Sequence, residues 1–246
     1  MKLKRFVSIP IVSVFVFLGF SYYVTIFIFI EDWFGLQTSA GVLNSLIFTL
    51  LIFLFLFSFS VCVLTDPGEV PASYVPDVEQ NQSPDQEFHK RGVYPSRCDK
   101  CSAHKPPRAH HCRVCRTCVL RMDHHCVWIN NCVGHRNYKS FLVLVFYATV
   151  ASFYFAIIIT ICTFNKDWDS IGNRPLKSFY FGCWCTSIGL SLVLGTLLGW
   201  NMYLTAHNMT TIEVLGPNML KWLWPTAVSH IKDGLSFPTA RDSSNQ

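Results

Sequence analysis

Four long stretches of hydrophobic residues, each free of Asp, Glu, Lys and Arg, divide this chain of 246 residues. They cover residues 6–30, 41–64, 141–164 and 179–204. About 20 apolar residues are enough for a helix to cross the hydrocarbon core of a bilayer. The pattern therefore predicts four transmembrane helices, with polar segments before, between and after them.

The overall composition supports a membrane protein. Hydrophobic residues make up 51% of the chain and charged residues only 14%, whereas charged residues form about a quarter of a soluble domain. A cleaved signal peptide is the alternative for the first stretch, but its apolar core is too long and no small-x-small cleavage site follows it. We therefore expect the first stretch to be a transmembrane helix.

The distribution of charge predicts the orientation. Residues 1–5 carry three basic side chains and residues 65–140 carry eleven of the 20 Lys and Arg, whereas residues 31–40 carry two acids and no base. Because basic segments stay in the cytosol, the N-terminus, the central region and, after four crossings, the C-terminus should be cytosolic. Three basic residues between positions 165 and 177 weaken this rule locally.

These predictions divide the chain into four parts. They are an N-terminal part with the first two spans (1–64), a cytosolic linker with a cysteine-rich domain (65–140), spans three and four (141–204) and a cytosolic tail (205–246).

The central part is dense in cysteine and histidine. Seven of the eleven cysteines and five of the nine histidines lie between Cys98 and Cys132, with repeated C-x2-C spacing. This density is typical of zinc sites, since each C-x2-C turn brings two sulfurs to one face of a tetrahedron. Cytosolic thiols stay reduced, so we expect metal ligands here rather than disulfides.

Counting the ligands leaves one cysteine over. Two tetrahedral sites need eight ligands, which six cysteines and two histidines supply. We expect the remaining cysteine to be Cys126, because it ends the run Asp123-His124-His125-Cys126. A thiol beside an imidazole that a carboxylate can orient is the usual arrangement of a cysteine nucleophile.

Side-chain alternation indicates how neighbouring residues divide. In extended chain His124 and Cys126 point one way and His125 points the other way, toward a metal. By the same rule, the adjacent His111 and Cys112 should bind different metals. Spacing alone leaves the full partition open, and two further histidines compete as ligands: His104 and His110.

The run Asp123-His124-His125-Cys126 within a cysteine-rich segment resembles the DHHC family of protein S-acyltransferases, or palmitoyltransferases. Four more motifs stand in the family's order over roughly 150 residues. They are Asp66-Pro67-Gly68, Lys105-Pro106-Pro107-Arg108-x-His110-His111-Cys112, Asn130-Asn131-Cys132-x4-Asn137-x3-Phe141 and Thr210-Thr211-Ile212-Glu213.

The resemblance implies a fold and a set of metal ligands. The fold is a polytopic α-helical membrane protein, with four transmembrane helices and a cytosolic cysteine-rich domain that holds two structural zinc ions between spans two and three. One zinc would be bound by Cys98, Cys101, His111 and Cys118, and the other by Cys112, Cys115, His125 and Cys132.

The resemblance also implies a reaction. Cys126 would attack the thioester of a long-chain fatty acyl-CoA, and the palmitoyl group would pass from S-acyl-Cys126 to a cysteine of a membrane-associated protein substrate. His124 would be the general base, Asp123 would fix its tautomer, and Thr211 would hydrogen-bond Asp123. The family also implies a bilayer, with the Golgi or ER membrane as the expected location.

Two features bear on the co-substrate. Ala148, Ala151 and Ser152 are small residues in the third stretch, and we expect them to leave a pocket for a sixteen- or eighteen-carbon chain. Five basic side chains of the central part are possible contacts for CoA phosphates, or else a solvated basic face near anionic lipid: Lys105, Arg108, Arg113, Arg116 and Arg121.

The C-terminal part departs from the family pattern. In the family a longer cytosolic stretch follows Thr-Thr-x-Glu, whereas here Glu213 runs directly into Val214-Leu215-Gly216-Pro217-Asn218, so this chain looks shortened. We expect Trp222, Trp224 and Phe237 to pack against the zinc domain.

The alternatives to an enzyme are a scaffold or adaptor of the same fold, impaired by its short C-terminal part, and a transporter with a zinc module. The transporter is disfavoured because the four stretches carry no charge for a midplane site. Nucleic-acid binding is not expected, since the basic segment lies between membrane spans and no groove-reading motif accompanies it. A scaffold or transporter should tolerate replacement of Cys126 by serine.

Overall fold

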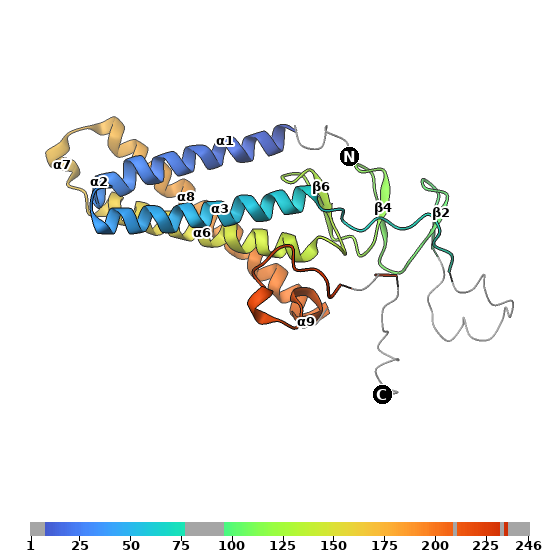
Figure 1. The fold of residues 1–246 in the computed structure, drawn as a ribbon. Helices are drawn as coiled ribbons and strands as arrows, with labels where there is room; N and C mark the ends of the chain where they lie inside the picture. Colours follow the sequence, from blue (N-terminus) through green and yellow to red (C-terminus); the bar gives the residue numbers. More distant parts are fainter. Residues whose placement is uncertain (1–7, 77–95, 209–210, 232–233, 236–246) are drawn as a thin grey trace.

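The computed structural model describes residues 8–76, 96–208, 211–231 and 234–235. Four long helical segments run antiparallel along one another (Figure 1). The first consists of α1 (Ile9–Tyr23), the π-helical turn η2 (Val24–Ile30) and α2 (Glu31–Trp33), and the others are α3 (Ser39–Leu64), α6 (Tyr138–Phe164) and α8 (Arg174–Asn208). All four are long and apolar enough to cross a membrane.

The four predicted spans are confirmed, but the helices extend beyond the apolar stretches. The third begins at Tyr138 rather than 141, and the fourth covers Arg174–His207 rather than 179–204. The helices continue through polar residues at their ends, which a hydropathy pattern excludes. At the start of α3, Thr38 caps the helix by accepting a hydrogen bond from the Gly41 amide at 3.0 Å. The predicted start of the first span at residue 6 lies outside the described residues.

Helix α6 is the centre of the bundle. Two thirds of its most apolar window is buried, against about a quarter or less in the other three helices. The core around α6 includes Phe29, Phe48, Phe155 and Tyr180. In the first helix five of the seven η2 residues are buried, but only Ile11 and Ser21 of α1 are. The first helix is therefore packed through η2, and α1 leaves space beside α6.

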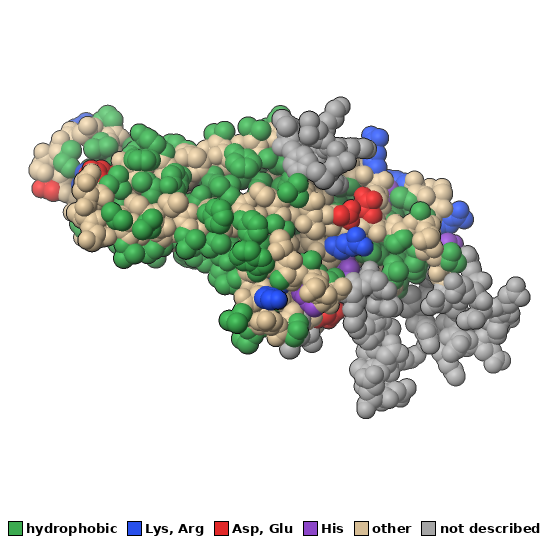
Figure 2. All heavy atoms as spheres, viewed as in Figure 1, with side chains coloured by type: hydrophobic (Ala, Val, Ile, Leu, Met, Phe, Trp, Pro, Cys, Tyr) green, Lys and Arg blue, Asp and Glu red, His purple; other side chains and the backbone are tan. Residues whose placement is uncertain are grey.

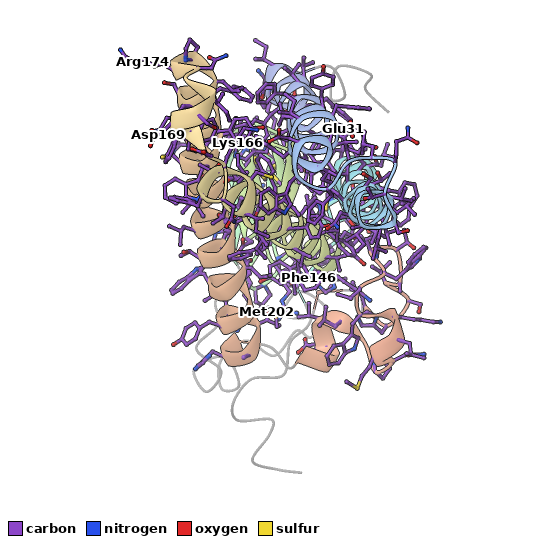
Figure 3. All side chains as sticks on the ribbon, turned by 90° about the vertical axis from the view of Figure 1, so that its left-hand side faces the viewer. Glu31, Phe146, Lys166, Asp169, Arg174 and Met202 are labelled. Atoms are coloured by element: carbon purple, nitrogen blue, oxygen red, sulfur yellow. The ribbon has the colours of Figure 1, made fainter. Side chains whose placement is uncertain are left out.

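At the end of the bundle near α2 and α7 (Trp168–Ile171), polar contacts join α2 to α8 and to the connection after α6. Lys166 donates to Asp32 Oδ1 at 2.6 Å, and the Tyr180 hydroxyl donates to Asp32 Oδ2 at 2.9 Å. Figure 3 views the bundle from this end and labels Lys166 among its charged residues. Asp32 thereby connects the end of the first helix to the residues after α6 and to α8.

The opposite end of the bundle carries three short antiparallel hairpins (Figure 1). Short strands joined by turns suit a domain of this size, which has little core of its own. The paired strands are β1 (Ser96–Cys98) with β2 (Ala103–Lys105), β3 (His110–Cys112) with β4 (Thr117–Val119), and β5 (His124–Cys126) with β6 (Asn131–Val133).

The turn Asp66-Pro67-Gly68 does more than end α3. Asp66 Oδ1 accepts from the Gly68 amide at 2.7 Å, and Gly68 adopts a φ of 98°, which favours glycine. The Gly68 carbonyl then accepts from the Leu120 amide at 2.7 Å, and the Pro67 carbonyl accepts from the Arg136 amide at 3.1 Å. The turn therefore joins the second helix to the hairpin domain.

The chain after α8 folds back onto the helices through α9 (Thr211–Leu215) and the 3-10 turn η3 (Met219–Lys221). The prediction that the tryptophans pack against the zinc domain is wrong. Trp222 packs against a cluster of Leu142, Val214 and Leu215, and the Trp224 ring lies 5.2 Å from the ring of Phe57 in α3. Both contacts are with helical segments, because the short C-terminal part returns along α6. Phe237 lies outside the described residues.

Gly134 lies where the turn after α3 packs against the hairpin domain. A Cβ at this position would lie 2.5 Å from Val119 Cγ1 and 2.7 Å from the Pro67 carbonyl oxygen. We expect Gly134→Ala to cost on the order of 1–3 kcal/mol, because the backbone must move to make room. The measurement is the Tm of the detergent-purified protein. Gly19→Ala is the control, since a Cβ there meets nothing within 4 Å. Equal Tm values for both variants would contradict close packing between the turn and the hairpin domain at Gly134.

Candidate active site and metal centres

The first of two Cys/His clusters consists of Cys98, Cys101, His111 and Cys118. The His111 Nδ1 atom lies 3.6 Å, 3.2 Å and 3.8 Å from the three Sγ atoms of Cys98, Cys101 and Cys118. In a tetrahedral zinc site, metal–ligand distances of about 2.0–2.3 Å place the ligand atoms about 3.5–3.8 Å apart. The four side chains fit such an ion.

The second cluster consists of Cys112, Cys115, His125 and Cys132. The His125 Nδ1 atom lies 3.5–3.6 Å from each of the three sulfurs, and the Cys115 and Cys132 sulfurs are 3.5 Å apart. This spacing also fits a tetrahedral zinc ion. The two groupings are those that the family resemblance implied. Among the described residues, neither His104 nor His110 belongs to such a cluster.

The hairpins explain why each cluster forms. The residues that follow two of the C-x2-C turns, Ser102 and Arg116, have φ values of 51° and 59°, a left-handed conformation that closes a tight turn. The Cys115 amide donates to Cys112 Sγ at 3.3 Å. Each C-x2-C turn thus presents two sulfurs together, and the opposite hairpin adds the imidazole.

The two clusters interlock through adjacent residues. His111 lies in the first cluster and Cys112 in the second, as side-chain alternation along β3 predicted. His125 lies in the second cluster, while His124 and Cys126 on either side of it point elsewhere and hydrogen-bond each other. Metal binding at His125 would therefore set the position of both neighbours.

Asp123, His124 and Cys126 form a hydrogen-bonded series. The His124 Nδ1 atom donates to Asp123 Oδ2 at 2.7 Å, and the His124 side chain also hydrogen-bonds Cys126. The Asp123 amide donates to the Val133 carbonyl at 2.9 Å, which brings the carboxylate around to the imidazole. The chain bends here as it must for Asp123 to reach His124.

This series changes the protonation of both partners. The hydrogen bond to Asp123, followed by the one to Cys126, raises the pKa of His124 to about 9. Burial raises the pKa of the Cys126 thiol, but the hydrogen bond with His124 and the backbone amide of Ile129 outweigh burial and bring the pKa below that of an ordinary cysteine. A thiolate paired with an imidazolium is the form in which a cysteine is nucleophilic.

A large apolar cavity of about 840 Å³ opens beside Cys126. It extends between α1, α3, α6 and α8, and the Phe141 ring stands edge-on to the His124 ring, 5.2 Å away, at its mouth. The predicted small residues Ala148, Ala151 and Ser152 line it on α6. Helix α1 packs loosely along its own length, and this is why the space exists.

The basic side chains of the hairpin domain differ in their exposure to solvent. The Arg121 Nη1 atom lies 3.3 Å from Glu213 Oε1, and the Arg121 side chain is only 11% exposed. Arg121 therefore joins the hairpin domain to α9, and a role in binding phosphate is not supported for it. Arg108, Arg113 and Arg116 are exposed. Thr211 begins α9, but its side chain lies outside what the structure describes.

Two asparagines that the sequence showed only as members of a motif position this site. Asn131 stands opposite Cys126 in the β5–β6 pair and donates to the carbonyls of Cys62 and Thr65 at 3.1 Å and 2.9 Å. Asn137 donates to the Cys132 carbonyl at 2.8 Å. Both asparagines are fully buried. Their place in the Asn-Asn-Cys motif was the available signal, but their partners lie up to 69 residues away.

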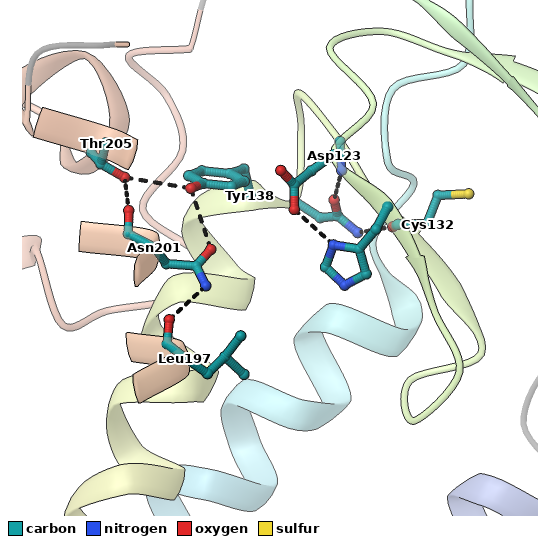
Figure 4. Close-up of polar contacts among 9 residues, drawn as sticks. Asp123, Cys132, Tyr138, Leu197, Asn201 and Thr205 are labelled. Atoms are coloured by element: carbon teal, nitrogen blue, oxygen red, sulfur yellow. Dashed lines mark hydrogen bonds and ion pairs between the residues drawn. The ribbon is translucent and has the colours of Figure 1, made fainter. Parts of the chain in front are cut away.

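A polar group on α8 approaches the site from the other side. Figure 4 shows Tyr138 between Asp123 and a pair of residues of α8, Asn201 and Thr205. The Tyr138 hydroxyl lies 3.4 Å from both Asn201 Oδ1 and Thr205 Oγ1. Polar side chains near the end of an apolar helix are costly unless they are paired, so this group fixes α8 against the start of α6.

Comparison with known proteins agrees with this geometry. A family model described as DHHC palmitoyltransferase matches residues 93–217. "Probable protein S-acyltransferase 15" of Arabidopsis thaliana is 52% identical, with 92% of this chain and 100% of the relative covered. "Probable protein S-acyltransferase 16" of the same species is 42% identical, with 96% and 94% covered. Human "Palmitoyltransferase ZDHHC3" is 32% identical, with 80% and 67% covered.

The fold and the site define a multi-pass membrane protein with a cysteine-rich domain that can hold two metal ions. The chain belongs to the DHHC palmitoyltransferase family of protein S-acyltransferases.

Metal analysis tests the two clusters. We expect the purified chain to contain two zinc ions, measured by inductively coupled plasma mass spectrometry, because each cluster offers four ligands at tetrahedral spacing. His111→Ala should lose at least one zinc per chain. His110→Ala is the matched control, since His110 is the exposed neighbour of His111 and lies outside both clusters. Equal zinc content in the two variants, or a single zinc in the unaltered chain, would count against the assignment.

Proposed function

We propose that this chain transfers a long-chain fatty acyl group, palmitoyl in particular, from acyl-CoA to cysteines of membrane-associated proteins through an S-acyl-Cys126 intermediate. The observation that carries the proposal is the position of Cys126, hydrogen-bonded to His124 at the mouth of an apolar cavity. A thiol nucleophile and a lipid-sized cavity meet at one point.

The first half-reaction forms the acyl-enzyme. The Cys126 thiolate attacks the thioester carbonyl carbon, the bond from that carbon to the CoA sulfur breaks, and the CoA thiolate leaves with the proton that His124 holds. Asp123 keeps the imidazole in the required tautomer through the hydrogen bond at Nδ1. Zinc ions bound by the two clusters would have a structural role, and the one at His125 would hold the strand β5 that carries this series.

The second half-reaction consumes the acyl-enzyme. A substrate cysteine gives its proton to His124 and attacks the same carbonyl carbon, and Cys126 leaves as the thiolate. Each half-reaction exchanges one thioester for another, so the energy change is small. Catalysis consists chiefly of bringing a lipid chain and a thiol together.

The cavity matches the length of a palmitoyl chain. Phe141, beside His124, and Phe155, which lines the deep part, are fourteen residues apart on α6, about 21 Å at 1.5 Å per residue. An extended sixteen-carbon chain is about 20 Å long, given a carbon–carbon bond of roughly 1.5 Å. An acyl chain attached to Cys126 would fill the cavity without leaving it.

Orientation and location belong to the same proposal. The hairpin domain, the N-terminus and the C-terminal tail lie in the cytosol, where acyl-CoA is available, in the Golgi or ER membrane. The chain divides functionally at residues 64, 140 and 204 into two spans, the linker and catalytic domain, two more spans and the tail. Of the basic side chains predicted to contact CoA phosphates, Arg108, Arg113 and Arg116 are exposed and Lys105 is half-buried, and these four remain the candidates.

The acyl-enzyme can be tested directly. We expect the purified chain, incubated with an alkyne-bearing palmitoyl-CoA, to take up label that neutral hydroxylamine releases, because hydroxylamine cleaves thioesters. Cys126→Ser should abolish that label. Label of equal intensity in Cys126→Ser would contradict the assigned nucleophile.

The same assay distinguishes the scaffold alternative. The alignment with the first Arabidopsis relative spans 259 positions, more than the 246 residues of this chain, so that relative has residues where this chain has none. We infer that some of them followed Glu213. No label in an unaltered chain that binds both zinc ions would mean that the residues lost are needed, and would favour a scaffold.

The cavity predicts selectivity for chain length. Ala151 is buried and lines the cavity, and a phenylalanine there would fill its deep half. We expect Ala151→Phe to shift the preferred acyl-CoA from sixteen carbons to fourteen or fewer, as measured by competition between acyl-CoAs of different length. Ile157→Phe is the matched control, because Ile157 is 58% exposed on the outer face of the same helix. The same preference in both variants would mean that the chain does not enter this cavity.

A further inference from the structure

Residues 214–227, called here the return segment, lie alongside the membrane-spanning helices. The Trp224 ring is 5.2 Å from the Phe57 ring, and the Tyr147 hydroxyl donates to the Leu223 carbonyl at 3.2 Å. Phe57 lies seven residues before the end of α3, and Tyr147 lies nine residues after the start of α6. At 1.5 Å per residue these contacts are about 10 and 13 Å along the helices from their ends at the hairpin domain.

These positions set the depth of the return segment. Helices α3 and α6, of 26 and 27 residues, are about 40 Å long, whereas the hydrocarbon core of a bilayer is about 30 Å thick. About 5 Å at each helix end therefore lies in the headgroup region. A contact 10–13 Å from the end then lies about 5–8 Å inside the hydrocarbon core. The return segment consequently dips into the membrane and comes back.

Backbone carbonyl groups beside the bilayer boundary need hydrogen-bond donors from the protein wherever water does not reach them. Lys139 supplies three. Its Nζ atom donates to the carbonyls of Leu215, Lys221 and Ala227 at 2.8, 3.1 and 2.8 Å, and the residue is 1% exposed. An ammonium group has three donors and no acceptor, so the described contacts use all of them.

Neighbouring side chains satisfy further carbonyl groups of the return segment. The Ser140 hydroxyl donates to the Pro225 carbonyl at 2.8 Å, and the Trp222 indole N–H donates to the Gly216 carbonyl at 2.8 Å. His230 Nε2 lies 3.0 Å from the Val214 carbonyl. Most donors come from the start of α6, and they act on carbonyls at the end of α9, in η3 and in the irregular backbone that follows. The arrangement is that of a loop built for an environment without water.

The outer side of the return segment is apolar. Four large hydrophobic side chains are exposed: Met219 at 70%, Leu220 at 95%, Leu223 at 47% and Trp224 at 52%. In Figure 2 hydrophobic side chains continue from the helices onto the segment below them. The patch is thus continuous with the lipid-facing surface of α3, and Trp is typical of the bilayer interface. Lys221 is exposed beside it and long enough to reach the headgroups.

We propose that the return segment is a re-entrant membrane loop, with Met219, Leu220, Leu223 and Trp224 inserted among the lipids of the leaflet nearest the hairpin domain, and that Lys139 is the positioning residue that holds it there. The occupant of the apolar patch is bilayer lipid. The inference rests on the transmembrane helices and not on the acyl-transfer chemistry, so it stands or falls separately from the proposed function.

Photocrosslinking in lipid nanodiscs tests the insertion. The full chain carries benzoylphenylalanine at position 220 (Leu220→benzoylphenylalanine) in phosphatidylcholine nanodiscs, and peptides are analysed by mass spectrometry after irradiation. We expect a lipid adduct at position 220 with a yield close to that at Leu46, which is 63% exposed on α3. Val75, 43% exposed in the linker before the hairpin domain, is the negative control.

Two outcomes would overturn the insertion. One is an adduct yield at position 220 no higher than at position 75. The other is crosslinking of position 220 mainly to a second protein chain, which would make the patch a protein interface.

The role of Lys139 has its own test. Lys139→Met keeps a long apolar stem but removes all three donors, and we expect the lipid adduct at position 220 to be lost while the zinc content stays at two per chain. Lys139→Arg, which retains a buried cation with several donors, should restore much of the adduct. An unchanged adduct in Lys139→Met, or equal loss in both variants with zinc retained, would contradict the positioning role.

Discussion

The two Cys/His clusters are the constraint on which the hairpin domain is built, because among the described residues each hairpin contributes ligands to at least one of them. Each hairpin has strands of three residues, and the buried side chains among them are largely the sulfurs themselves. Metal binding would supply folding energy that so small a core lacks. Since His125 belongs to a cluster and stands between His124 and Cys126, the same constraint orients the nucleophile and its base.

Hydrogen bonds determine where the hairpin domain lies relative to the helices. Asn131 ties β6 to the end of α3, and the Asp66-Pro67-Gly68 turn ties α3 to the strands that follow. Cys126 is thereby held at the mouth of the apolar cavity rather than out in solvent. Loose packing of α1 leaves that cavity open, and tight packing of η2 keeps the bundle together.

Sequence predicted most strongly what local spacing determines. The four helices, the hairpins and the separation of His111 from Cys112 follow from runs and alternation over a few residues. Contacts between distant residues were not predictable: Lys139 meets carbonyls 76 to 88 residues away, and Arg121 pairs with Glu213 at a separation of 92. The wrong prediction for Trp222 and Trp224 has the same cause. The sequence indicates that an aromatic residue will be packed, but it does not show against which partner.

In the proposed acyl-enzyme, the fatty chain attached to Cys126 lies in the cavity between the helices. The most direct measurement is to load the purified chain with a palmitoyl analogue that carries a diazirine at the terminal carbon, irradiate it, and map the crosslinks by mass spectrometry. We expect crosslinks to residues that line the cavity far from Cys126, such as Phe48, Ser152, Phe155 and Leu190. Crosslinks confined to free lipid or to the hairpin domain would contradict it.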